Sequence, residues 1–147
     1  MIPKKSLGQN FLTSIPARLA IVKAGELSPS DVVLEIGPGK GFLTRALLDT
    51  GVKVVALEKD RDLIPILSET FKDEISSGQL FVIEGDALEF NPSDDKILKD
   101  SYKLIANIPY YITGAILSRY LSLPTPPKSM VVLIQKDYNL KFYFGVR

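Results

Sequence analysis

A short apolar strand that runs into closely spaced glycines is the feature that most limits how this chain can fold. Residues 32–36 are apolar at four of five positions and rich in β-branched side chains, which predicts a buried strand. Gly37, Gly39 and Gly41 follow at alternate positions, and a helical pattern begins directly after them. Glycine backbone and a helix amino terminus let a chain approach a ligand closely. The segment therefore predicts a ligand-binding loop.

An acidic residue further along the chain narrows the choice of ligand. Glu58 follows the next apolar run, 21 residues after Gly37, where a carboxylate can accept hydrogen bonds from ribose hydroxyls. The spacing is G-x-G-x-G, not that of dinucleotide-binding proteins, and there is no phosphate-binding G-x-x-x-x-G-K-[ST]. An adenosine ligand without a phosphate chain fits best, so S-adenosylmethionine is the expected cofactor. The alternative is a tight strand–helix connection that binds nothing.

Composition limits the chemistry that the chain can perform. The 147 residues suit one domain and include no cysteine and no histidine, which excludes disulfides, Cys/His zinc sites and any catalytic triad that uses His or Cys. We expect no metal site, and catalysis by Asn, Asp, Glu, Lys, Tyr, backbone groups or a cofactor. No apolar run is long enough to span a membrane and no signal peptide is recognisable, so we expect a cytoplasmic protein without a membrane partner.

Charge is distributed unevenly along the chain. Residues 1–23 carry a net charge of +4, residues 24–100 carry −8, and residues 101–147 carry +5. Two basic ends around an acidic middle could grip a polyanion such as RNA, although solvated surface would give the same counts.

Alternating periodicities indicate an α/β fold with a parallel sheet. Strands are expected over 32–36, 52–57, 79–84, 102–106 and 130–135, and helices over 15–25, 42–50, 62–72 and 112–123. Ligands on such sheets bind at the carboxyl ends of the strands. The glycines, Glu58, Asp86 and the segment 107–110 all lie at such ends. Asp86 could accept from an adenine amino group, or it could be an ordinary turn aspartate.

The segment Asn107-Ile-Pro-Tyr110 is the sharpest chemical signal. An adenine amino nitrogen is a poor nucleophile because its lone pair is delocalised into the ring. The Asn107 side-chain oxygen and the carbonyl before Pro109 could accept its protons and localise that lone pair, while Tyr110 stacks on the base. The alternative is a plain X-Pro turn after a strand.

Together these motifs resemble the rRNA adenine dimethyltransferases. The likeness rests on the segments 5–12 (KSLGQNFL), 35–41 (EIGPGKG), Glu58, 85–87 (GDA) and 107–110 (NIPY), in order and spacing. It spans residues 3 to about 136 and is nearest to the bacterial enzymes that dimethylate two adjacent adenines of 16S rRNA during ribosome biogenesis. The resemblance implies a class I S-adenosylmethionine-dependent methyltransferase fold, which is Rossmann-like, and a small-ribosomal-subunit precursor as partner. We expect a monomer.

The resemblance also implies roles for individual residues. The expected catalytic residues are Asn107, Pro109 and Tyr110. The expected cofactor-binding residues are Gln9, Asn10, Leu12, Glu35, Gly37, Gly39, Gly41, Glu58, Lys59, Asp86, Ala87 and Asn107.

Two departures from the family leave alternatives open. Family members often have Asn where this chain has Tyr111, which puts a secondary contact in doubt. The family continues beyond residue 136 with further strands and a helical domain, whereas here residues 137–147 form an atypical tail. We therefore expect an incomplete methyltransferase domain over 1–136. The alternatives are a 23S rRNA methyltransferase of the macrolide-resistance type, or an inactive fragment that binds cofactor or RNA.

Overall fold

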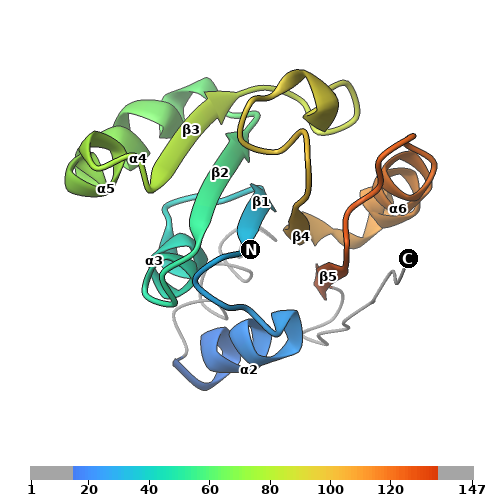
Figure 1. Cartoon of the computed structure of the whole chain (residues 1–147). Helices are drawn as coiled ribbons and strands as arrows, with labels where there is room; N and C mark the ends of the chain where they lie inside the picture. The colour runs from blue at the N-terminus through green and yellow to red at the C-terminus, as the bar shows by residue number, and fades with distance from the viewer. Residues whose placement is uncertain (1–14, 136–147) are drawn as a thin grey trace, which may run out of the picture.

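The computed structural model describes residues 15–135, which form a parallel α/β sandwich (Figure 1). The strands are β1 (Val32–Ile36), β2 (Lys53–Glu58), β3 (Leu80–Glu84), β4 (Lys103–Pro109) and β5 (Met130–Gln135). The α-helices are α2 (Ile15–Gly25), α3 (Phe42–Leu48), α4 (Ile64–Thr70), α5 (Lys72–Ser76) and α6 (Thr113–Leu121). Short 3-10 turns are η1 (Arg61–Leu63), η2 (Pro92–Asp94) and η3 (Tyr110–Ile112). The predicted fold class is confirmed. The tail at 137–147 lies outside the described residues.

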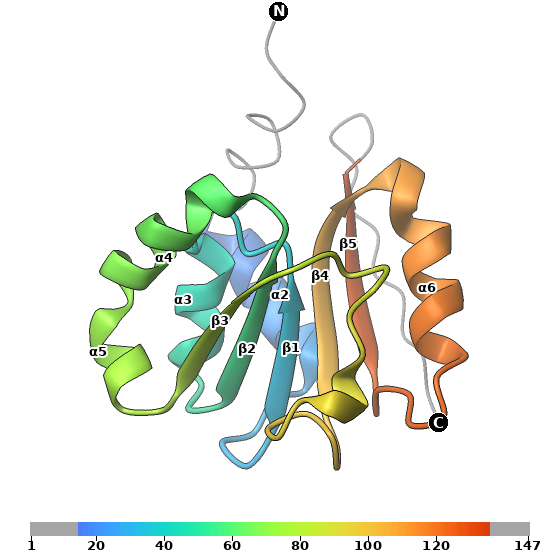
Figure 2. The same ribbon diagram turned by 90° about the horizontal axis from the view of Figure 1, so that it is seen from above.

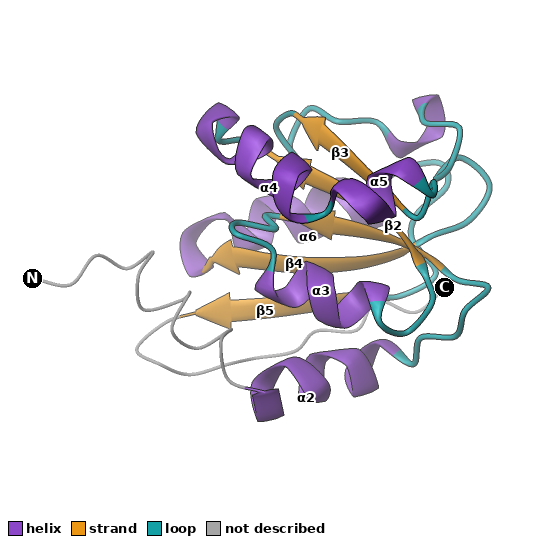
Figure 3. Cartoon of the chain, turned by 90° about the vertical axis from the view of Figure 1, so that its left-hand side faces the viewer, coloured by secondary structure: helices purple, strands orange, loops and turns teal. Residues whose placement is uncertain are grey.

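The strand order is β3-β2-β1-β4-β5, and every neighbouring pair is parallel. The arrowheads of β2, β3, β4 and β5 accordingly lie toward the same side in Figure 3, with β3 tilted relative to the others. From β1 the chain first moves outward through β2 and β3, and then returns to place β4 on the other side of β1. The carboxyl end of β1 is thus the point where the strand order reverses, which is where ligands bind on open α/β sheets.

Alternating side chains divide the core into two layers. One core cluster holds Val33 and Ile105 with residues of α2, α3 and α4. The other holds Leu34 and Leu104 with residues of α6 and of the loop before β4. Figure 2 shows α3, α4 and α5 on one side of the sheet and α6 on the other. The sheet is therefore buried on both faces, as parallel sheets require.

Strand β4 is longer than the sequence predicts. The expected strand ends at residue 106, whereas the observed one continues through Asn107, Ile108 and Pro109. These three residues pair with the end of β5, beyond the last pair with β1 at Ala106. The segment Asn107–Pro109 is therefore held as strand, which fixes it more firmly than the predicted turn would.

The helix expected over 62–72 is interrupted. It starts with η1, continues as α4 with Pro65 in its first turn, and breaks at Phe71 before α5. Phe71 is 1% exposed and packs in the core below the glycine loop, with the Arg45 guanidinium 4.7 Å from its ring centroid. The helix is therefore broken at the residue whose ring, that of Phe71, packs into the core.

No helix within residues 15–135 has the length and apolar character needed to cross a lipid bilayer.

Candidate functional site at the carboxyl edge of the sheet

Strand register places three of the predicted residues in a row. Ile36, the last residue of β1, pairs with β2 on one side and β4 on the other. The next residues along these three strands are Gly37, Glu58 and Asn107. Because side chains alternate along a strand, Glu58 and Asn107 point to the same face of the sheet, the face covered by α3.

The glycine loop has a conformation and contacts that need glycine. Gly37, Gly39 and Gly41 have φ values of 75°, 59° and 95°. A Cβ on Gly37 would lie 2.8 Å from the carbonyl oxygen of Asn107, and one on Gly41 would collide with the Phe71 ring. A Cβ on Gly39 would meet nothing within 4 Å, so the loop faces open space there. The backbone is thus packed on the protein side and accessible on the ligand side.

The Glu58 carboxylate is fixed at the rim by backbone groups. Glu58 is the last residue of β2, as predicted, and is 7% exposed. The Gly39 N–H donates to its Oε1 at 3.0 Å, and the Asp60 N–H donates to its Oε2 at 2.9 Å. Each carboxylate oxygen has a second lone pair, so the group can still accept from a ligand hydroxyl. One bond ties it directly to the glycine loop.

The structure shows Asp86 in the turn role, one of the two roles that its sequence left open. Its Oδ1 accepts from the Leu88 N–H at 2.9 Å, which is the turn role. Its Oδ2 lies 3.6 Å from Lys59 Nζ, with side-chain exposures of 31% and 80%. Ala87 beside it is buried in the core. The carboxylate therefore remains half-buried beside β2 and can reach a ligand at the rim.

Glu35 lies beneath the glycine loop. It is 0% exposed, and its Oε1 accepts from Thr44 Oγ1 at 2.6 Å, while Oε2 has no hydrogen-bond partner in the described part of the chain. Burial raises the pKa of Glu35 to about 7, the Thr44 hydrogen bond opposes that rise, and the Glu58 charge adds to it. Thr44 was missed from sequence. The available signal was a lone polar residue on the buried face of helix α3.

Exposed aromatic rings lie at the end of the segment 107–110, which is called the acceptor segment below. Tyr110 and Tyr111 are 40% and 70% exposed and meet edge to face, with ring centroids 6.0 Å apart. Pro109 ends β4, and its carbonyl accepts from Thr113 Oγ1 at 3.3 Å. The two rings are perpendicular, so one flat base can stack on either ring but not on both in this arrangement. Gln9, Asn10 and Leu12 lie outside the described residues.

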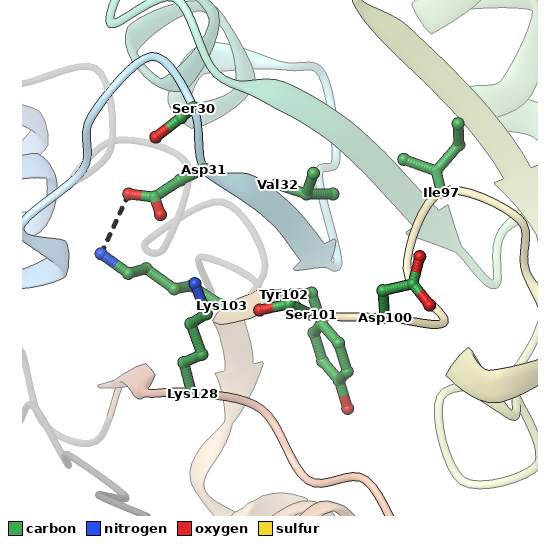
Figure 4. Close-up of a pocket in the computed structure, with 9 residues that line it drawn as sticks. All are labelled: Ser30, Asp31, Val32, Ile97, Asp100, Ser101, Tyr102, Lys103 and Lys128. Carbon is green, nitrogen blue, oxygen red and sulfur yellow. Dashed lines mark hydrogen bonds and ion pairs between the residues drawn. The ribbon is translucent and has the colours of Figure 1, made fainter.

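A cavity of about 250 Å³ occupies the opposite edge of the sheet. It lies where β1 and β4 begin, and Figure 4 shows the Asp31–Lys103 ion pair on its wall, with Oδ2 and Nζ 3.0 Å apart. Lys103 Nζ also donates to the Glu26 carbonyl at 2.8 Å. This network joins the end of α2 to the sheet. The cavity is thus remote from the glycine loop.

Known proteins resemble this chain in sequence over most of its length. The sequence profile described as "Ribosomal RNA adenine dimethylase" matches residues 3–143. The chain belongs to this family. Two relatives named ribosomal RNA small subunit methyltransferase A, from Clostridium botulinum and Deinococcus radiodurans, are 44% and 47% identical to this adenine dimethylase family member over 90% and 92% of its length. The alignments cover 47% and 44% of those relatives, so the chain spans about half their length.

Two solved structures of similar proteins share the fold. The 23S rRNA methyltransferase ErmE is 30% identical, with a TM-score of 0.71, over 85% of this chain and 48% of ErmE. A dimethyladenosine transferase from Plasmodium falciparum is 31% identical, with a TM-score of 0.68, over 85% of this chain and 43% of that one. The expected methyltransferase fold is therefore confirmed.

Proposed function

We propose that this chain carries the cofactor and target-base sites of an S-adenosylmethionine-dependent enzyme that dimethylates the exocyclic amino groups of two adjacent adenines in 16S rRNA. The observation that carries the proposal is the row of Gly37, Glu58 and Asn107 at one edge of the sheet in a member of the adenine dimethylase family. One edge thereby brings a loop suited to a cofactor beside a segment suited to an adenine.

The residues at the rim suit S-adenosylmethionine. Glu58 would hold the ribose hydroxyls, the glycine loop would accommodate the methionine portion, and Asp86 would accept from the adenine amino group. Open space at Gly39 and the half-buried Asp86 leave room for these contacts. When bound, the cofactor supplies a methyl group on a positively charged sulfur.

The residues of the acceptor segment suit an adenine amino group. The Asn107 side-chain oxygen and the Ile108 carbonyl would accept its two protons, which favours a localised lone pair on nitrogen. The exposed ring of Tyr110 would stack on the base and hold it in register. No general base is required before attack, which agrees with a sequence that has no histidine.

Removal of the Glu58 carboxylate should weaken cofactor binding. Loss of charged hydrogen bonds to the ribose costs roughly 1.5–3 kcal/mol, so Glu58→Ala should raise the Kd for S-adenosylmethionine by about 10- to 150-fold. Calorimetric titration measures this directly. Glu84→Ala is the matched control. Glu84 ends β3 and pairs in register with Glu58, but its Oε2 lies 3.5 Å from Arg61 Nε. Equal affinity for Glu58→Ala and the unsubstituted chain would remove Glu58 from the site.

A 23S rRNA methyltransferase of the macrolide-resistance type is the second candidate. The fold similarity to ErmE favours it, since that protein acts on 23S rRNA. The identity to small-subunit enzymes is higher, which favours the 16S substrate. Undermethylated small and large ribosomal subunits, offered separately with tritiated S-adenosylmethionine, distinguish the two. Transfer to the large subunit alone, to cytosine or to protein would overturn the 16S assignment.

The amino-terminal arm should contribute to RNA or cofactor binding. It carries Lys4 and Lys5 beside Gln9 and Asn10, and lysine–phosphate contacts make RNA affinity depend on salt. Deletion of residues 1–8 should therefore flatten the salt dependence of RNA binding, or raise the Kd of the cofactor. Filter binding at several salt concentrations and calorimetry test both effects. If neither changes, the arm has no role in binding.

The proposal extends to the partner, the oligomeric state and the location of the protein. A small ribosomal subunit precursor would be the partner, the protein would act as a monomer, and the cytoplasm would be its location. Sedimentation of the chain alone, and its co-sedimentation with subunits, would test the first two statements.

A further inference from the structure

Helix α6 holds the loop that is proposed to contact the adenine ring of the cofactor. The hydroxyl of Tyr120 donates to the Ala87 carbonyl at 2.9 Å, and the Arg119 guanidinium donates to the Phe90 carbonyl. Tyr120 is 0% exposed, so its hydrogen bond is shielded from water. Two hydrogen bonds from helix α6 therefore hold the loop between Ala87 and Phe90.

The other end of the same helix adjoins the acceptor segment. Strand β4 ends at Pro109, η3 follows at once, and α6 begins at Thr113, whose hydroxyl donates to the Pro109 carbonyl. The nine residues of α6 span about 13 Å at 1.5 Å per residue. Helix α6 thus connects the segment proposed to bind the target base with the loop proposed to bind the cofactor.

We propose that Tyr120 is a positioning residue, whose hydroxyl holds the loop bearing Asp86 and Ala87 in the conformation that receives the adenine ring of the cofactor. The inference rests on the proposed function, since it assumes the same cofactor at the same edge. It adds a residue that would not touch the cofactor itself. Without this bond the loop would occupy other conformations, and the apparent affinity would fall with the fraction that remains competent.

A second buried tyrosine provides a comparison for the hydroxyl of Tyr120. Tyr102 belongs to the same core cluster and is 3% exposed, but its hydroxyl has no hydrogen-bond partner in the described part of the chain. Both rings fill the core, and only Tyr120 reaches the loop. Burial raises the pKa of Tyr120 to about 12, so its hydroxyl remains a neutral donor throughout the physiological range.

The test compares Tyr120→Phe with Tyr102→Phe in the chain as it stands. Each change removes one buried hydroxyl and keeps the ring. Tyr120→Phe should raise the Kd for S-adenosylhomocysteine by about 3- to 10-fold in calorimetry and speed amide hydrogen exchange over residues 87–90. Tyr102→Phe should change neither quantity. Arg119→Met, which frees the Phe90 carbonyl and also removes the guanidinium that lies 5.9 Å from the Tyr120 ring centroid, should act like Tyr120→Phe.

The outcomes separate the inference from the proposed function. Faster exchange over residues 87–90 with unchanged affinity would overturn the positioning role while leaving cofactor binding intact. Equal effects of Tyr120→Phe and Tyr102→Phe on affinity and exchange would show general loosening of the core and would also overturn it. If the unsubstituted chain binds no S-adenosylhomocysteine, the proposed function fails, and the positioning role fails with it.

Discussion

Replacement of Asn107 by alanine is expected to lower methyl transfer by about two to three orders of magnitude, the usual cost of removing one polar group that stabilises charge in a transition state. The reason is that the side-chain oxygen at position 107 would no longer accept a proton of the target amino group. The fold should survive, because Asn107 contributes its backbone to the ladder with β5. Tritiated methyl transfer to undermethylated small subunits measures the change, and circular dichroism checks the fold. Equal methyl transfer by Asn107→Ala and the unsubstituted chain would refute the mechanism.

Substitutions at Tyr110 provide the matched comparison for that experiment. Tyr110→Phe should retain much of the activity, because stacking on a base needs only the ring. Tyr110→Ala should lose far more, since stacking contributes ~1–3 kcal/mol per base. If Tyr110→Phe is as defective as Tyr110→Ala, the hydroxyl and not the ring is what matters.

The stability of the protein is expected to fall as pH rises from 4.5 to about 7 because of Glu35. Its folded-state pKa is raised from 4.5 to about 7, mainly by complete burial. A raised pKa means that the stabilising form is the protonated one, which is fully present below pH 4.5 and lost as pH rises through 7. The shift corresponds to about 3 kcal/mol. Glu35→Gln cannot ionise, so its stability relative to the unsubstituted chain should increase by up to that amount between pH 5 and pH 8.

Urea denaturation at the two pH values measures this difference. Glu69→Gln is the control, because it makes the same chemical change at a side chain that is 81% exposed on α4, where little effect is expected at either pH. A constant difference between Glu35→Gln and the unsubstituted chain from pH 5 to pH 8 would show that Glu35 stays ionised in the folded state.

The sequence predicted the sheet well because local signals were strong there. The residues of β1 and β2 are apolar and β-branched, and Gly37 and Gly51 end or separate elements where positive φ is needed. It predicted the end of β4 poorly. Asn107 and Pro109 favour a turn locally, and only pairing with β5, much later in the chain, holds them as strand. The break at Phe71 likewise depends on packing against residues that are remote in sequence.

For the candidate site residues, the sequence predicted their places at the ends of strands but not their contacts. Glu58 was placed correctly at the end of its strand, because the apolar run 52–57 directly precedes it. Its bonds to the Gly39 and Asp60 amides depend on how the loops fold back, which no spacing rule gives. Nothing in the sequence singled out Tyr120, because the partner of a buried hydroxyl is known only once the fold brings Ala87 close to it.

The close approach of Gly37 to the Asn107 carbonyl has a consequence for redesign. The contact involves a main-chain oxygen, which every amino acid supplies, so under the proposed function position 107 can be varied in search of a different methyl acceptor without rebuilding the glycine loop. Position 37 has no such freedom, since even a methyl group there would press on that oxygen. New acceptor specificity is therefore best sought in libraries that randomise the end of β4 and keep the glycine loop constant.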